Sequence, residues 1–180
     1  RKAVLKGLAQ ELKDDLLATY SACQTNDVYE YTPDAVGRRR LKNVALGYLM
    51  ELKEQKLFRL CEEQFNSASN MTDEIAAFIF LVDSNASGRE DAISAFYEKW
   101  HGDELVLDKW FSAQALSTRS DVLDQMDALN EHPDFDIKTP NRIRSLISVF
   151  CGQNPVSFHD KSGKGYKFLA RNIKAIDPIN

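Results

Sequence analysis

The sequence lacks several features that would assign a chain quickly to a class of protein. No apolar stretch approaches the ~18 consecutive residues that a membrane-spanning helix needs, and no signal-peptide-like apolar segment stands near the N-terminus. Cysteine is scarce and widely spaced, which argues against a disulfide framework or a zinc cluster and suits buried thiols in a reducing compartment. The three cysteines are Cys23, Cys61 and Cys151. We therefore expect a cytoplasmic protein with no membrane partner.

Catalytic motifs are also missing. The three histidines, His101, His132 and His159, lie far apart. None belongs to a His-Glu-x-x-His pattern, which places two zinc ligands on one helix face with a general base between them. No cysteine has a CxxC partner, and the Gly-Lys-Gly segment 163–165 lacks the rest of a phosphate-binding loop. We expect no catalytic residue and no metal site in this chain.

The charge of the chain is moderately acidic. A net charge of −4 and an isoelectric point near 5.4 argue against nucleic acid as the main partner. The one basic cluster comprises Arg38, Arg39, Arg40 and Lys42, and we interpret it as a solvated helix face after Gly37. Nucleic-acid binding through this cluster stays open as an alternative, and it predicts steep salt dependence.

Apolar residues recur with helical period almost throughout, so the predicted fold class is all-α. At 180 residues and 43% hydrophobic, the chain can bury a real core, and we predict a single domain, 1–180. Expected N-terminal caps are Asn70, the Ser-x-x-Glu box of Ser87 and Glu90, and the pair Thr118 and Asp121. The expected helices span about 2–18, 34–49, 52–66, 71–83, 87–100, 104–116, 121–129, 139–150 and 165–175.

The lengths of these helices and of their connections favour antiparallel neighbours. Gly37-Arg38 and Gly88-Arg89 each open a helix followed by another, 51 residues apart, a partial internal echo. We favour an irregular α-solenoid of antiparallel helix pairs over a closed bundle. Such a fold has a concave surface suited to gripping a ligand. The aromatic residues Trp100, Trp110 and Phe111 are interpreted as core rather than as a stacking platform.

Residues 139–166 carry the most explicit structural signals. Thr139 is a candidate N-cap and Pro140 suits the first helical position. An apolar stripe follows at i, i+3, i+4 and i+7, formed by Ile143, Leu146, Ile147 and Phe150. Arg142 and Arg144 lie about 200° apart around such a helix, so at most one of them can face a concave surface.

Eight short strings, in order along nearly the whole chain, carry a resemblance to a known family. They are GRRRLKN (37–43), NMTD (70–73), GRE (88–90), FYEKWH (96–101), LVLDKWF (105–111), PNRIRSLI (140–147), GQNPVSFH (152–159) and GKGYKFL (163–169). Each alone says little, but as a set they are specific. The chain resembles the C-terminal domain of bacterial aminopeptidase N, the alanyl aminopeptidase branch of the M1 zinc metallopeptidase family.

The resemblance implies a superhelical all-α domain, the fourth and last of its enzyme. The zinc ligands, the general base and the residues that hold the substrate amino terminus would lie in an earlier, thermolysin-like domain. The parent would be a broad-specificity zinc aminopeptidase, in which an activated water attacks a zinc-polarised carbonyl and releases neutral and basic N-terminal residues. Because further helices are expected after Asn180, we expect a truncated fragment that is inactive alone.

The resemblance also implies one site residue. In that family the C-terminal domain closes over the catalytic domain and walls an internal chamber that admits peptides and excludes folded proteins. Arg144, the second arginine of the string 140–147, matches a position that faces this chamber, where a guanidinium can hold a peptide carbonyl or carboxylate in a forked pair. Alternatively, Arg144 pairs with a carboxylate of a neighbouring helix. Arg142 is expected to serve the architecture. The implied partners are the catalytic domain of the same chain and peptide substrates.

A hypothesis from another class is a free-standing α-solenoid interaction module that grips a protein partner. Composition and periodicity alone favour it over an enzyme domain. The complete reading frame discriminates between the two, because only the enzyme requires a His-Glu-x-x-His motif and a downstream glutamate several hundred residues before Arg1.

Overall fold

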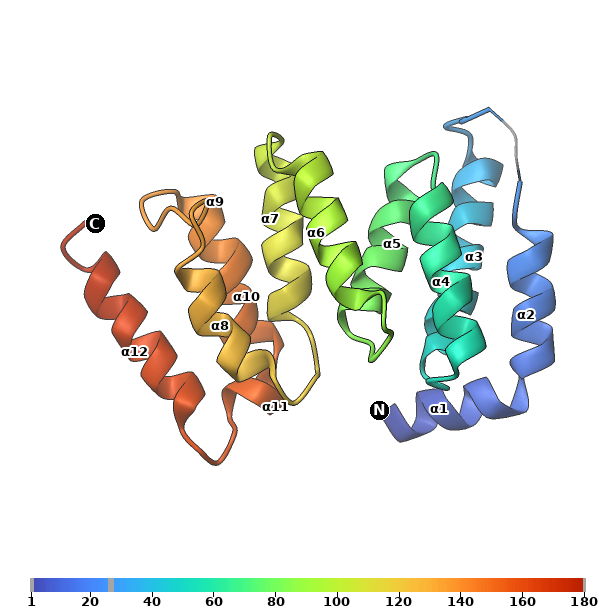
Figure 1. Cartoon of the computed structure of the whole chain (residues 1–180). Helices are drawn as coiled ribbons and strands as arrows, with labels where there is room; N and C mark the ends of the chain where they lie inside the picture. The colour runs from blue at the N-terminus through green and yellow to red at the C-terminus, as the bar shows by residue number, and fades with distance from the viewer. Residues whose placement is uncertain (1, 26–27, 180) are drawn as a thin grey trace. The chain divides into compact units, whose positions relative to one another are not determined.

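The computed structural model describes residues 2–25 and 28–179, and every regular element in these ranges is a helix (Figure 1). The all-α prediction is confirmed. The helices form two compact units, Arg1–Ala92 and Ile93–Asn180, with the boundary inside the first turns of α6. The expectation of one domain over 1–180 stays a prediction. No helix in the described ranges is both long and apolar enough to span a membrane.

The first unit contains α1 (Lys2–Glu11), α2 (Lys13–Ala22), α3 (Pro33–Met50), α4 (Gln55–Ser67) and α5 (Met71–Val82). Successive helices from α2 to α5 run antiparallel, and α1 lies across their ends (Figure 1). Their facing sides enclose a core that includes Tyr20, Leu46, Phe58, Cys61 and Leu81. The antiparallel pairing predicted from helix and loop lengths is therefore found within this unit.

The single helix predicted over residues 2–18 is wrong. The chain breaks at Leu12, whose φ of −102° and ψ of 16° lie outside the helical region, and it continues as α2 to Ala22. Leu8 and Leu12 stay 43% and 45% exposed instead of forming a buried stripe. Lys13 starts the second helix and donates to the Glu54 carboxylate at 2.5 and 2.7 Å, so an ion pair from a distant residue accompanies the break.

Of two N-terminal caps predicted in this part of the chain, one is present and the other is not. The Asn70 side chain accepts a hydrogen bond from the Asp73 N–H at 3.0 Å, which confirms the cap of α5. The capping box of Ser87 is wrong, because α6 begins only at Arg89. The N–H of Gly88 instead donates to the Glu62 carboxylate at 3.2 Å.

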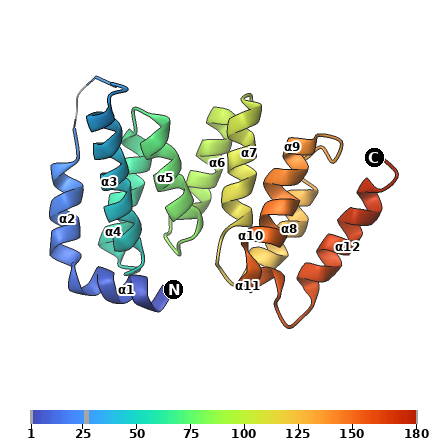
Figure 2. The ribbon, with the colours of Figure 1, turned by 180° about the vertical axis from the view of Figure 1, so that it is seen from behind.

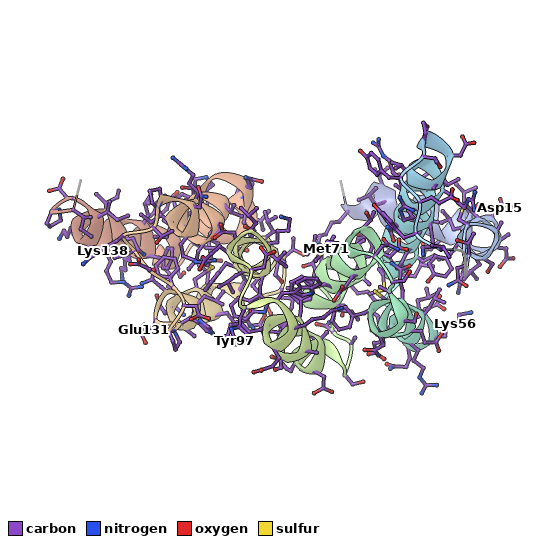
Figure 3. The ribbon with its side chains drawn as sticks, turned by 90° about the horizontal axis from the view of Figure 1, so that it is seen from above. Asp15, Lys56, Met71, Tyr97, Glu131 and Lys138 are labelled. Atoms are coloured by element: carbon purple, nitrogen blue, oxygen red, sulfur yellow. The ribbon has the colours of Figure 1, made fainter. Side chains whose placement is uncertain are left out.

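The second unit contains most of α6 (Arg89–Trp100), then α7 (Glu104–Ala115), α8 (Val122–Asn130), α9 (Pro140–Ile143), a π-helical turn η1 (Arg144–Ser148), α10 (Val149–Gln153), α11 (Pro155–Phe158) and α12 (Lys164–Ile176). From behind, α6 and α7 run side by side (Figure 2). Seen from above, Tyr97 of α6 and Glu131 after α8 lie on the same side of this unit, away from α9 and α10 (Figure 3).

The core of the second unit is aromatic, as the sequence predicted for α7. Trp110 is 5% exposed and Phe111 is fully buried, which confirms their assignment to the core, whereas Trp100, at the end of α6, is only partly buried. The predicted cap of α8 is also wrong. Asp121 makes no capping bond, because its carboxylate accepts from the Arg119 guanidinium and from Gln125.

Candidate functional site

The helix predicted over residues 139–150 is present but is not regular. It starts as α9, widens into the π turn η1 and resumes as α10. The predicted apolar stripe is buried at Leu146, Ile147 and Phe150. Pro140 occupies the first turn as expected, but Thr139 does not cap it, because its hydroxyl donates to the Asp136 carboxylate at 3.0 Å.

Arg142 is an architectural residue. Its side chain is 3% exposed, and its guanidinium donates to Asp108 at 2.8 Å and to Glu104 at 2.5 Å, both on α7. The guanidinium carbon also lies 5.2 Å from the centre of the Phe111 ring, within the range of a cation–π contact. Two carboxylates and an aromatic face therefore fix α9 against α7.

Arg144 has the opposite environment. Its side chain is exposed, and its guanidinium donates to the side-chain oxygen of Asn141 at 3.1 Å, one turn earlier on the same face. Within residues 2–25 and 28–179, Arg144 forms no ion pair, so the alternative of a carboxylate partner on a neighbouring helix is not found there. A guanidinium that projects from a fixed helix can donate hydrogen bonds to an acceptor from outside this unit.

Arg144 begins the π turn, and the hydrogen bonds of this turn differ from those of a regular α-helix. The N–H of Val149 donates to the carbonyls of Arg144, five residues back, and of Leu146, three residues back, instead of to that of Ser145, four residues back. The carbonyl of Ser145 accepts instead from the hydroxyl of Ser112 on α7, at 2.9 Å. The hydroxyl of Ser145 donates to the carbonyl of Arg142 at 2.9 Å. π turns of this kind are frequent at functional sites.

A second polar anchor ends the segment. The Asn154 side chain is 4% exposed and donates to the carbonyls of Ala115 and Ser117, at 2.9 and 2.7 Å. Its oxygen also accepts from the N–H of Ser157, which caps α11. The chain between Arg142 and Asn154 is thus held to α7 and its C-terminal loop at both ends.

His132 belongs to an aromatic cluster beside Arg142 that periodicity did not predict. Its ring centre lies 5.1 Å from those of Tyr97 and Trp110, and its Nδ1 accepts from the N–H of Asp134 at 3.2 Å. Burial lowers the pKa of His132, and Arg142 adds to this effect, while Asp134 opposes it. A neutral imidazole that accepts through Nδ1 suits this packing.

The other two histidines each contact a tyrosine, and two of the three cysteines carry thiols that burial makes less acidic. His101 stacks on Tyr97, and His159 shares a 2.7 Å hydrogen bond with the Tyr166 hydroxyl. Burial raises the pKa of the Cys61 thiol well above its ordinary range and that of Cys151 to about 11, so neither is an activated thiolate. Over the described ranges, no group of three or more His, Cys, Asp or Glu side chains is placed to hold a metal ion.

The basic cluster on α3 is not one continuous face. Lys42, expected on a solvated face, is instead 8% exposed and donates to the Asp73 carboxylate at 2.7 Å, so that expectation is wrong for this residue. Asp73 also accepts from Asn43 at 2.9 Å. The Arg39 guanidinium lies over the ring of Tyr29, at 4.8 Å from its centre. Because Asp73 lies 31 residues after Lys42, the local pattern of charges around Lys42 gives no indication of this ion pair.

An apolar hollow of about 680 Å³ opens on the first unit between α1, α3 and α5. Val44 on α3 is 47% exposed in it. Gly47 permits its shape, since a Cβ there would lie 2.9 Å from the Phe80 ring. Its lining is mostly apolar and comprises Leu5, Val36, Arg40, Asn43, Val44, Gly47, Tyr48, Glu51, Thr72, Ala76 and Phe80.

Comparison with known proteins gives a consistent result. The family described as "Domain of unknown function (DUF3458_C) ARM repeats" matches residues 1–180. The chain is 37% identical over 180 residues to aminopeptidase N of Escherichia coli, covering all of this chain and 21% of that protein. It is 38% identical over 174 residues to aminopeptidase N of Caulobacter vibrioides, covering 96% of this chain and 20% of the relative.

A solved structure matches along the same length. The crystal structure of Legionella pneumophila aminopeptidase A in complex with aspartic acid superposes with a TM-score of 0.89 at 31% identity, covering 100% of this chain and 22% of that one. The chain therefore spans about a fifth of the length of the proteins that it matches.

Proposed function

We propose that this chain, which belongs to the DUF3458_C family of ARM-repeat domains and corresponds to the C-terminal domain of aminopeptidase N, walls the substrate chamber of a zinc aminopeptidase. The parent enzyme would remove N-terminal residues from peptides with broad specificity. The domain would limit access to the chamber, so that flexible peptides enter and folded proteins do not.

The observation that carries the proposal is the contrast between two arginines of one helix. Arg142 is buried among its partners, whereas Arg144 is exposed and, among residues 2–25 and 28–179, its side chain bonds only to the neutral side chain of Asn141. We propose that Arg144 lines the chamber and binds a carbonyl or the terminal carboxylate of the peptide, downstream of the scissile bond. A guanidinium offers a forked pair of donors to either group.

We assign the zinc and the chemistry of hydrolysis to the catalytic domain of the same polypeptide. The described residues supply no cluster of three or more suitable ligands, so they do not fit a catalytic zinc site. The part of this chain is to position and to confine. A peptide held at its downstream end loses less freedom on reaching the transition state.

The catalytic domain is also the partner that we propose for the apolar hollow of the first unit. Val36 and Val44 leave apolar surface there that is open among the described residues. Arg40 of α3 and Glu51, directly after α3, also line the hollow, and neither forms an ion pair within residues 2–25 and 28–179. The matched relatives are about five times as long as this chain, so a neighbouring domain is available to cover that surface.

The experiment that tests the proposal compares the parent polypeptide with residues 1–180 alone. We expect the parent to bind zinc stoichiometrically and to hydrolyse an alanyl anilide and short peptides, and the chain alone to do neither. The same peptide displayed at the N-terminus of a folded protein by a short linker should resist hydrolysis. A parent without peptidase activity after zinc loading would instead favour a free-standing interaction module.

A further inference from the structure

One stripe of α7 faces the segment that carries Arg144. Glu104, Asp108 and Ser112 follow one another at intervals of four residues, so their side chains lie on one face of the helix. The two carboxylates bind the Arg142 guanidinium, and the Ser112 hydroxyl donates to the Ser145 carbonyl. The face is a polar track along which α9 and η1 are attached.

The track fixes the hydrogen-bond register of the π turn. In a regular α-helix, the Ser145 carbonyl would accept from the N–H of Val149. Here that N–H donates to Arg144, and the donor of Ser145 is the hydroxyl of Ser112 at 2.9 Å. Because a buried carbonyl without a donor is costly, the hydroxyl compensates the bond that the π turn gives up.

The two ends of the segment explain why an extra residue is accommodated there. Arg142 is held by Glu104 and Asp108, and Asn154 is held by the carbonyls of Ala115 and Ser117. A return to regular α-helix would remove one residue from a turn. It would shift one end by ~1.5 Å and rotate it by ~100° relative to the other. One of the two anchored ends would then lose its partners.

The register decides which side chains face outward. Ser145, Leu146 and Ile147 are consecutive and all at most 6% exposed, while Arg144 and Ser148 on either side of them are exposed. Three consecutive buried residues cover a wide arc in an α-helix, and the wider π turn lets them share one packed face. Arg144 is thereby placed at the edge of that face.

We infer that Ser112 is a positioning residue for Arg144. Its hydroxyl holds the π register, and the π register sets the direction in which the Arg144 guanidinium leaves the helix. The claim that this direction matters for peptide binding rests on the proposed function. The link between Ser112 and the π register does not depend on it. Nothing in the local sequence 139–154 carries this signal, since Ser112 lies 33 residues before Ser145.

The test uses the complete parent enzyme with four variants: Ser112→Ala, Ser112→Thr, Ser148→Ala and Arg144→Ala. Ser148 is the matched control, an exposed serine in the same π turn. Crystal structures of the parent and of Ser112→Ala report the register directly. Kinetics with a tripeptide and with an alanyl anilide report its consequence, because the anilide has no residue downstream to meet Arg144.

We expect Ser112→Ala to lose the single π register, either with the Val149 N–H returning to the Ser145 carbonyl and one of the two anchored ends released, or with Arg144 in more than one orientation. The value of kcat/KM for the tripeptide should fall about three- to tenfold, mainly through KM, while that for the anilide stays within about twofold. Ser112→Thr, which keeps the hydroxyl, should restore the tripeptide value, and Ser148→Ala should match the parent.

An unchanged π register with a single Arg144 orientation in Ser112→Ala would overturn the inference. So would equal losses on both substrates without rescue by Ser112→Thr, since that pattern describes a residue needed only for stability. If Arg144→Ala leaves both substrates unaffected, the proposed function of Arg144 fails, and the crystallographic register still decides the claim about Ser112.

Discussion

Replacing Arg142 by alanine is the substitution for which the structure gives the clearest magnitude. The side chain of Arg142 is 3% exposed and that of its partner Asp108 is 18% exposed, so the substitution strands a largely buried carboxylate. Breaking a buried ion pair by removing one partner costs ~3–5 kcal/mol. Glu104 is 78% exposed, so its lost pairing adds little. Partial rehydration of Asp108 places the expectation at the lower end, about 3 kcal/mol.

The assay is urea unfolding followed by tryptophan fluorescence. Both tryptophans, Trp100 and Trp110, lie in the second unit, so the signal reports on the unit that contains Arg142. A loss of about 3 kcal/mol in a chain of this size corresponds to a fall in Tm of roughly 6–12 °C. Arg142→Lys keeps the charge but loses the fork, and should cost about 1–2 kcal/mol.

Arg144→Ala is the matched control, two residues further along the same helix. Its side chain is exposed and, in the described part of the chain, bonds to Asn141 alone, so the expected change is within about 0.5 kcal/mol. If Arg142→Ala proves no more destabilising than Arg144→Ala, the assignment of Arg142 as the anchor of α9 is refuted.

Three further predictions rest on separate features. Gly165→Ala should destabilise by about 1–3 kcal/mol, because its Cβ would lie 2.2 Å from the Phe158 carbonyl oxygen, whereas Gly152→Ala, with no atom within 4 Å, should be neutral or stabilising; equal urea midpoints would contradict this. Burial lowers the pKa of His132, so the folded state takes up a proton at this residue less readily than the unfolded state does. The contribution of His132 to the free energy of unfolding should therefore be complete above pH ~6.5 and be lost as the pH falls below that value. The variant His132→Asn should show a smaller fall in urea midpoint between pH 7.5 and 5.5 than the unsubstituted protein. Val44→Glu should lower the Tm of the parent by several degrees if the hollow is covered there, with Val44→Leu as control; an unchanged Tm would show the hollow open.

Much of the fold could be predicted from local sequence because the helices carry their own signals. Apolar period marks most of the helices, although it missed the break at Leu12. The Asn70 side chain caps α5 as expected, and the opposed directions of Arg142 and Arg144 follow from helical geometry. The strings shared with the aminopeptidase family also identified the relatives correctly.

The features that were missed depend on partners distant in sequence or on competing local bonds. The expected caps Asp121 and Thr139 are engaged by Arg119 and by Asp136 instead. Lys42 is buried because Asp73 lies across from it. These outcomes depend on which polar groups lie within hydrogen-bond distance of a side chain in the folded structure. The preferences of single residues do not contain that information.

The π turn is the most instructive case. Its sequence predicts an ordinary α-helix, and the predicted apolar stripe is buried at Leu146, Ile147 and Phe150. The turn is stabilised by the hydroxyl of Ser112, on another helix. A candidate channel residue could thus be named from sequence, while the device that orients it could not.

The most direct test of the central claim is steady-state kinetics of the intact parent enzyme carrying Arg144→Ala. The substrates are a short peptide, which has residues downstream of the scissile bond, and an alanyl anilide, which has none. The account predicts that kcat/KM falls about tenfold or more for the peptide alone, equivalent to ~1.4 kcal/mol of lost transition-state binding. Equal losses on both substrates, or no loss on either, would contradict the assignment of Arg144 to the chamber wall.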